Sequence, residues 1–312
     1  MAKGSTDLGQ HRVHSREIVE SELEQVAAFL TKTFGYVDGY FLNILNALTR
    51  HATPSGFPKY GYALLCDDII VGVILMIFAK VKSADAESVR CHVTAWSVDP
   101  GYRSYAALFF SRSLHYKNIT YLSLLAIKRS LPFIELQGFS KLSDGQFAAI
   151  PIASRGASEP EVRLIRADAV PSADVDAFEQ DLLLAHQSYG CLSFWCMAKD
   201  GAHPFVFQPR AFKGFLPGAQ LIYCRDVSEF VRFLRPIGRF LAMHGRFLVA
   251  INSNGPIHGV VGKHFPGNQP WYFKGPKPHI GDLAYTQFTM HAPPKKTVAR
   301  MWSEYWSSGS SN

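Results

Sequence analysis

The sequence lacks the patterns that accompany several common kinds of site. It contains no G-x-S-x-G, no P-loop and no H-E-x-x-H, which argues against a serine hydrolase, a P-loop nucleotidase and a zincin. Its five cysteines form no C-x-x-C pair, so no zinc ribbon is indicated. Cys191 and Cys196 could in principle bind a metal, but we expect ordinary core thiols there and no metal site.

Long apolar runs are missing as well. The longest uncharged apolar run, 69–79, has eleven residues, well short of the roughly 20 that a membrane-spanning helix needs. The first ten residues hold no apolar segment of the kind that signals secretion. From these absences we expect a cytoplasmic protein with no membrane partner.

The excess of positive charge is spread along the chain. The formal net charge is +7 and the sequence pI is about 9.1, yet there is no basic tail and no basic run flanked by aromatic residues. We therefore expect an attraction for small anionic molecules and no nucleic-acid partner.

Length and composition indicate two domains. A chain of 312 residues that is 47% hydrophobic can bury two cores of ordinary size. The segment 153–160 has the glycine, serine and proline content of a linker. We expect a flexible N-terminus over 1–10, a first domain over 11–152, a second domain over 161–292 and a C-terminal tail over 293–312.

Hydrophobic periodicity predicts alternating strands and helices in the first half. Ser21 and Glu24 have capping-box spacing at the start of the first helix, and Gly72 marks a bulge or a close approach. Ser130 is expected to cap a short helix, and 143–145 to separate the last two strands. The expected strands are 13–19, 60–66, 69–81, 90–98 and 120–125, and the expected longer helices are 22–34, 40–50 and 109–116.

The second half repeats this order. The pattern predicts strands at 162–167, 193–197, 204–208, 220–225 and 246–251, and helices at 173–187 and 227–244. We interpret this as a second copy of the same fold, because the order of elements matches although the sequences do not.

The most informative stretch is the sequence V-D-P-G-Y-R-S-Y-A-A-L at 98–108, between a predicted strand and a predicted helix. At the start of a helix, backbone N–H groups have no intrahelical partner and the helix dipole adds partial positive charge. A phosphate or pyrophosphate is therefore the natural occupant of such a turn.

This stretch resembles the acyl-CoA signature of the GNAT acyltransferase superfamily, V-x-P-x-x-[RQ]-G-x-G-x-[GA]. Val98, Pro100 and Arg103 match it, whereas Ser104, Ala106 and Leu108 replace its glycines. Residues 135–139 match the E-x-x-G-F found near the end of the fold. The resemblance implies an α/β (α+β) fold with a mixed, mostly antiparallel sheet and flanking helices, duplicated in two tandem domains.

The resemblance also implies acetyl-CoA or another acyl-CoA as cosubstrate. The turn amides would bind its pyrophosphate, and the N–H near Val98 would polarise the acyl carbonyl. Because a leucine occupies the last glycine position, we expect the Leu108 side chain to turn into the core and leave its amide usable; the alternative is that this domain has lost CoA. The candidate CoA-binding residues are Ser97, Val98, Arg103, Ser104, Tyr105, Ala106, Ala107 and Leu108.

Proton transfer is less clearly marked. Alternation along 90–98 places His92 on one face of the strand, where the resemblance implies the acceptor pocket. Its ordinary pKa of about 6.5 would suit a general base, the alternative being a strand histidine bonded to a neighbour. Many family members carry a tyrosine at the position of Ile134, so the acid role falls to Tyr105, Tyr121 or water.

The second half is expected to bind no CoA. Asp226 and Glu229 form a capping-box pattern whose carboxylates would satisfy the amides of the equivalent turn and repel a pyrophosphate. We expect this half to help recognise a small-molecule or peptide acceptor, which would receive the acyl group on an amine or hydroxyl. The alternatives are a catalytically silent GNAT-fold binding protein and an enzyme like the tandem-GNAT aminoacyltransferases, whose longer inserted helices are not evident.

Overall fold

The computed structural model describes residues 12–83, 86–123, 131–154, 161–171, 174–212 and 215–286. These residues belong to two compact units, the first within 1–77 and 93–116 and the second within 78–92 and 117–294. Strands β3 (Ile69–Ser83) and β4 (Ala86–Val98) contribute to both units. The predicted domains, 11–152 and 161–292, divide the chain at positions other than the boundaries of these units, and they remain a prediction. The expected N-terminus 1–10, most of the linker 153–160 and the tail 293–312 lie outside the described residues.

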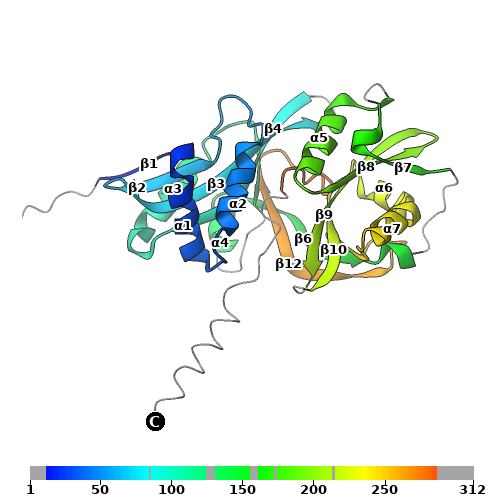
Figure 1. Cartoon of the computed structure of the whole chain (residues 1–312). Coiled ribbons are helices and arrows are strands. Elements are labelled where there is room, and N and C mark those ends of the chain that lie inside the picture. The colour runs from blue at the N-terminus through cyan, green and yellow to red at the C-terminus, as the bar shows by residue number, and fades with distance from the viewer. Residues whose placement is uncertain are drawn as a thin grey trace, which may run out of the picture. The chain divides into compact units, whose positions relative to one another are not determined.

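Unit 1 is built on antiparallel strands in the order β1-β2-β3-β4. Strand β1 spans Val13–Glu17 and β2 spans Gly61–Cys66, and the helices are α1 (Leu23–Phe34), α2 (Tyr40–Thr49) and α3 (Ala106–Ser113) (Figure 1). The register between β2 and β3 shifts at Leu64, where Gly72 lies. A Cβ on Gly72 would come within 3.1 Å of the Leu64 and Val98 side chains, which confirms the predicted bulge and close approach.

Two details of unit 1 differ from the sequence prediction. Ser21 does not cap the first helix: the chain enters α1 through a 3-10 turn at Glu20–Glu22, and the Glu22 carboxylate accepts a bond from the Val19 N–H at 2.9 Å. Arg16 pairs with the same carboxylate at 2.6 Å, so tertiary contacts fix this helix start. The helix expected at 109–116 begins three residues earlier, because Ala106 continues a preceding 3-10 turn.

In unit 2 the strands follow the order β5-β12-β6-β11-β10-β9-β8-β7. Its helices are α4 (Leu131–Leu136), α5 (Ala177–Ser188), α6 (Val227–Arg232) and α7 (Leu234–Met243). The predicted cap Ser130 lies outside the described residues. The strands are β5 (Thr120–Ser123), β6 (Ser140–Ala149), β7 (Arg163–Arg166), β8 (Leu192–Ala198), β9 (Gly201–Phe212), β10 (Leu216–Tyr223), β11 (Leu248–Ser253) and β12 (Gly262–Lys274).

Alternation along these strands separates two apolar cores in unit 2. Phe207, Leu221 and Ile251 pack with α6 and α7, whereas Val206 and Ile222 pack with α5. Neighbours in sequence therefore bury side chains on opposite faces, as the pleat of a strand requires. Both faces of this part of the sheet are occupied by helices, which gives the α/β layering predicted from the sequence (Figure 1).

Two predicted elements of unit 2 are wrong. The expected break at 143–145 does not exist: β6 runs unbroken and pairs with β11 and β12. Gly145 permits this, because a Cβ there would collide with the Phe265 carbonyl of β12. The single helix expected at 227–244 is divided at Phe233, whose φ of −97° and ψ of 21° are not helical.

The order of elements is repeated, as the sequence predicted. From β1 to β5 the order is one strand, helices α1 and α2, three strands, helix α3 and one strand, and from β7 to β11 it is one strand, helix α5, three strands, helices α6 and α7 and one strand. In the second set, β10 and β11 pair in parallel from Gly218 to Gln220 and then diverge. The fold class is confirmed as a mixed, mostly antiparallel sheet with flanking helices. Within the described residues, no helix is long and apolar enough to cross a membrane.

Candidate functional site

The predicted strand, turn and helix meet at 97–108 in unit 1. Strand β4 ends at Val98, and Asp99 then binds back to the sheet through its N–H and the Val71 carbonyl at 2.7 Å. The Asp99 carboxylate accepts a bond from the Gly101 N–H at 3.0 Å. A 3-10 helix over Pro100–Tyr105 leads directly into α3. The local geometry expected from the sequence is therefore present.

Several amides of this turn are already bonded within the chain. Besides Gly101, the Tyr102 N–H donates to the Asp99 carbonyl at 2.9 Å, and the Ala106 N–H donates to the Arg103 carbonyl. Arg103 and Ser104 are exposed. Among the described residues, none forms a hydrogen bond or ion pair with the Arg103 guanidinium. An anion at this turn would thus meet the available Arg103 guanidinium and the Ser104 hydroxyl.

The expectation for Leu108 is wrong. Its side chain is 51% exposed, because Phe109 and Phe110 take the inward positions at the start of α3 with 2% exposure each. Two consecutive aromatic residues fill the space beneath this helix turn, and Phe110 lies 4.8 Å from the ring of Trp96 on β4. The other candidate residues surround the turn: Tyr105 and Ala107 are exposed, and Ser97, Val98 and Ala106 are half-buried.

His92 lies in a buried stretch of β4. It is 2% exposed, and neither ring nitrogen has a hydrogen-bond partner. Burial, and then the charge of Arg90, lower the pKa of His92 to about 3. The ordinary pKa assumed from the sequence is therefore incorrect here, and the imidazole is neutral at physiological pH.

The groups considered for the acid role differ in access. Ile134 is buried in α4 and Tyr121 is 2% exposed, whereas Tyr105 is 41% exposed. Among these three, only Tyr105 presents a hydroxyl to solvent.

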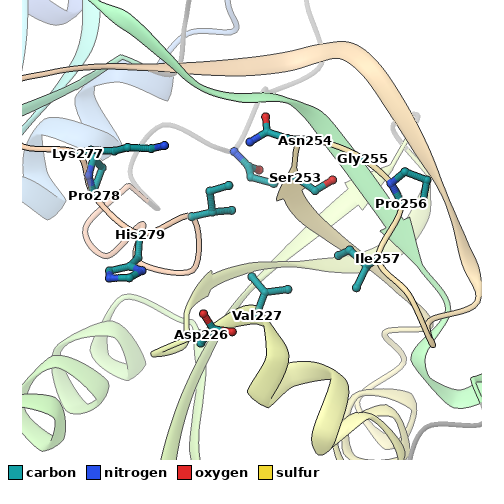
Figure 2. Close-up of a pocket in the computed structure, with 12 residues that line it drawn as sticks. Asp226, Val227, Ser253, Asn254, Gly255, Pro256, Ile257, Lys277, Pro278 and His279 are labelled. Carbon is teal, nitrogen blue, oxygen red and sulfur yellow. The ribbon is translucent and has the colours of Figure 1, made fainter.

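Unit 2 contains a pocket that the sequence did not reveal. It opens beyond the point where β10 and β11 diverge, and its volume is about 720 Å³ (Figure 2). Its walls come from the start of α6, the end of β11 with the turn that follows it, and a segment that follows β12. They comprise Asp226, Val227, Asn252, Ser253, Asn254, Gly255, Pro256, Ile257, Lys277, Pro278, His279 and Ile280.

The pocket combines one buried hydroxyl with charged groups at its edge. The Ser253 side chain is 8% exposed, and its Oγ has no hydrogen-bond partner. Lys277 extends across one side of the pocket (Figure 2) and forms no ion pair with any residue that the structure describes. Asp226 caps α6 by accepting the Ser228 N–H at 2.7 Å, and its bonds to Ser228 and the charge of His279 lower its pKa.

The predicted capping box at this turn is only half present. Asp226 is the cap, but Glu229 reaches away from it and binds the Nδ1 of His203 at 2.9 Å. His203 bonds on its other side to Asp200, which also pairs with Arg232. Glu229 thus fastens α6 to the β8–β9 hairpin and does not satisfy a turn amide.

A short segment lies against the diverging end of β10. The Cys224 N–H donates to the Gly281 carbonyl at 2.9 Å, and the Leu283 N–H donates to the Ile222 carbonyl at 2.8 Å. Residues 280–283, called the strap below, therefore occupy the backbone groups that β11 leaves unpaired. An extended ligand along β10 would have to displace the strap, and the absence of a CoA site in the second half remains a prediction.

Buried side chains hold the strap in place. Arg90 pairs with the Asp282 carboxylate and also donates to the Asp282 carbonyl at 2.8 Å. The Tyr285 N–H donates to Nε2 of His186 at 3.0 Å. In the sequence, the only signal for this arrangement is the run K-P-H-I-G-D, whose histidine lines the pocket and whose aspartate binds Arg90. No group of three or more metal-binding side chains occurs among the described residues, and Cys191 and Cys196 are buried as expected.

No protein-family model and no curated protein sequence matches this chain. Solved structures match it in fold. A GCN5-related N-acetyltransferase from Anabaena variabilis aligns with a TM-score of 0.53 and 12% identity over 84% of this chain and 72% of its own. Another GCN5-related N-acetyltransferase, from Kribbella flavida, aligns with a TM-score of 0.51 and 14% identity over 84% of this chain and 71% of its own.

A third similar structure is the glucosamine N-acetyltransferase region of a fungal multi-domain GH3 β-N-acetylglucosaminidase. It aligns with a TM-score of 0.54 and 9% identity over 85% of this chain and 38% of that chain. At such identities the likeness is one of fold.

Proposed function

From the GNAT fold that this chain adopts, we propose that it transfers an acyl group from an acyl-CoA to an amine or hydroxyl of a small molecule or peptide. The observation that carries the proposal is the β4–turn–α3 junction, which presents the Arg103 guanidinium and the Ser104 hydroxyl at an exposed helix start. These groups suit the pyrophosphate of CoA.

The proposed roles follow from position. Ser97 and Val98 end the strand, and a main-chain N–H there would hold the acyl oxygen, while residues 103–108 would hold the pyrophosphate. The proton of the attacking group would pass to water, because His92, with its pKa lowered to about 3, is too weak a base to take it near neutral pH. When the acceptor attacks the carbonyl carbon and the C–S bond breaks, the thiolate would take its proton from water or from Tyr105.

The pocket of unit 2 is proposed to bind a polar ligand of its own. Its size of about 720 Å³ fits a compact polar molecule, and Ser253 and Lys277 supply a hydroxyl and a cation. Acceptor classes to assay are peptide amines, polar metabolites and amino sugars, with glucosamine included because one similar structure is described as a glucosamine N-acetyltransferase region.

Ser104→Asp tests the CoA site. A carboxylate at this exposed position would repel the pyrophosphate and should weaken CoA binding by about 1–3 kcal/mol, or roughly 5- to 150-fold in Kd. Ser111→Asp is the matched control, because Ser111 is also exposed on α3 but lies toward its other end. Calorimetry with CoA and acetyl-CoA should show the loss only in the first variant. Equal affinity in both variants would reject the turn as the CoA site.

A catalytically silent binding protein is the second candidate. The unpartnered, buried His92 and the absence of a hydroxyl at Ile134 favour it. Such a protein would bind acyl-CoA at the turn, yet release no free thiol with any acceptor of the panel. Thiol release measured with a chromogenic disulfide separates the two candidates.

A further inference from the structure

Arg210 in β9 is a largely buried cation with an incomplete set of partners. Its Nη1 donates to Oε1 of Gln220 at 2.8 Å, and its guanidinium lies over the Phe212 ring, 4.8 Å from the centroid. Its Nε is buried and has no partner. Within the described chain, no carboxylate pairs with it. Buried charges in proteins are normally paired, because removing a charge from water without compensation is costly.

The unpartnered edge of this guanidinium is the one that binds oxyanions side-on. Two other arginines of unit 2 show the geometry. In Arg225, Nε and Nη2 donate to the two oxygens of Glu179 at 2.8 and 2.6 Å, and in Arg166 the same pair of nitrogens binds Asp168 at 3.1 and 2.8 Å. In Arg210 this edge has neither a carboxylate nor a carbonyl on it among the residues that the structure describes.

The surroundings of Arg210 fix its position. Gly218, opposite Arg210 on β10, has no side chain, and a Cβ there would collide with the Phe212 ring. The glycine thus admits the ring on which the guanidinium lies. Gln220, two residues further along the same face, is fully buried. The cation is held between an aromatic ring and a carboxamide.

The carboxamide belongs to a buried polar network. Gln220 accepts a bond from Gln146 at 3.1 Å and donates to Asn252 at 3.2 Å, while Gln146 also donates to Asn252 at 3.3 Å. These side chains come from β10, β6 and β11, on the face away from α6 and α7. They are neutral, so they orient the guanidinium without neutralising it. Burial accordingly lowers the pKa of Arg210, with no acid to oppose the effect.

We propose that the Nε–Nη2 edge of Arg210 is a binding site for a small oxyanion, a carboxylate or phosphoryl group, positioned by Gln220 and Phe212. The Arg210 side chain is only partly exposed, so the anion would gain a strong, charge-assisted pair. The site does not depend on the proposed acyl transfer, because none of its residues belongs to the turn at 97–108. Of the residues around it, only Asn252 also lines the pocket of unit 2, and Asn252 reaches Arg210 through Gln220.

The test follows the Arg210 Nε–H signal in a ¹H–¹⁵N spectrum of the full-length chain. The signal is assigned by its loss in Arg210→Met, and sodium acetate or sodium phosphate is then titrated against sodium chloride at equal ionic strength. Acetate, phosphate or both should move this signal with saturation, and chloride should not. The arm that saturates at lower concentration identifies carboxylate or phosphoryl as the preferred group. The proposal would be overturned if neither acetate nor phosphate moved the Arg210 Nε–H signal more than chloride does.

Thermal unfolding supplies a second readout with a matched control. In chloride, Arg210→Met should melt no lower than the parent, since it removes an uncompensated cation and Gln220 keeps its bond from Gln146. Arg225→Met should melt lower, since it leaves Glu179 buried beside Tyr223. The responsive anion should raise the melting temperature of the parent and of Arg225→Met, and leave Arg210→Met unchanged.

Two further results bear on the assignment. If Arg210→Met lowers the melting temperature as much as Arg225→Met, Arg210 has a structural role and the proposal fails. Arg210→Lys, which keeps the charge but not the fork, should weaken the anion response by about tenfold. Ser104→Asp should leave the Arg210 signal and its titration unchanged, so a failed CoA site and a failed oxyanion site give different results.

Discussion

His92 shows how a single residue can change its chemistry on folding. The sequence places it on a strand with an ordinary pKa, and the fold removes it from water beside Arg90, which lowers that pKa to about 3. Leu108 and Glu229 show the same dependence on context. Each has a familiar local pattern, yet Leu108 is exposed beside two inward phenylalanines, and Glu229 on α6 binds His203 on β9.

The burial of His92 predicts an acid-sensitive contribution to stability. The pKa is about 6.5 in the unfolded chain and about 3 in the folded one, so protonation favours unfolding as the pH falls below 6.5. The stabilisation is complete above pH 6.5 and is lost progressively toward pH 3, by about 2 kcal/mol at pH 5. Denaturant unfolding of the parent and of His92→Gln between pH 5 and 8 measures this. The variant should show a smaller acid-dependent loss, and parallel curves would contradict the buried neutral state.

At the scale of the element, the strap at 280–283 accounts for the form of the pocket. Strand β10 leaves β11 after Gln220, and the strap binds the backbone groups that become unpaired. Arg90 on β4 anchors it through Asp282, and His186 on α5 binds the Tyr285 N–H just after it. An element without regular secondary structure thus completes the end of the sheet, which explains why hydrophobic periodicity gave no sign of it.

Gly281 is the residue that lets the strap lie close to β10. A Cβ there would lie 2.8 Å from the Cys224 carbonyl oxygen and 2.9 Å from its Sγ. Gly281→Ala should therefore loosen the strap and destabilise unit 2 by about 1–3 kcal/mol. Hydrogen exchange should accelerate at the Cys224 and Leu283 amides. Gly255→Ala is the control, since it lines the same pocket and its Cβ would have open space around it.

At the scale of the whole molecule, the repeat of elements does not mean two independent halves. Strand β6, in the first half of the chain, pairs with β11 and β12 from the second half. Phe147 and Ala149 of β6 belong to the core that α6 and α7 cover. The boundaries of the two compact units therefore do not coincide with the boundary between the two repeated sets of elements.

Truncation tests this dependence. A chain that ends after Ser154 would expose both edges of β6 together with Phe147, and unpaired edges and apolar surface promote aggregation. We expect this chain to aggregate or to lack a cooperative unfolding transition, as judged by size-exclusion chromatography and circular dichroism. A soluble, cooperatively folded product would instead support the predicted domain over 11–152.

The stoichiometry of CoA binding is a property of the whole chain. Because the strap occupies β10 and Asp226 lies at the adjacent turn, we expect one CoA per chain by calorimetry. The double variant Asp226→Ala, Glu229→Gln should keep that value, and its binding should remain sensitive to Ser104→Asp. Two equivalents bound to the parent would show that the second half retains a site.

The sequence by itself determined the order of elements, the repeat, the bulge at Gly72 and the turn at 98–108. These features rest on local periodicity and on turn residues, which act over a few neighbours. Only the tertiary structure decided that β6 is one strand between β11 and β12, that the strap fills the end of β10, that His92 is buried, and that Arg210 is only partly exposed and has no paired carboxylate among the described residues. Pairing between distant segments and the loss of hydration depend on which parts of the chain come together, and no local pattern carries that information.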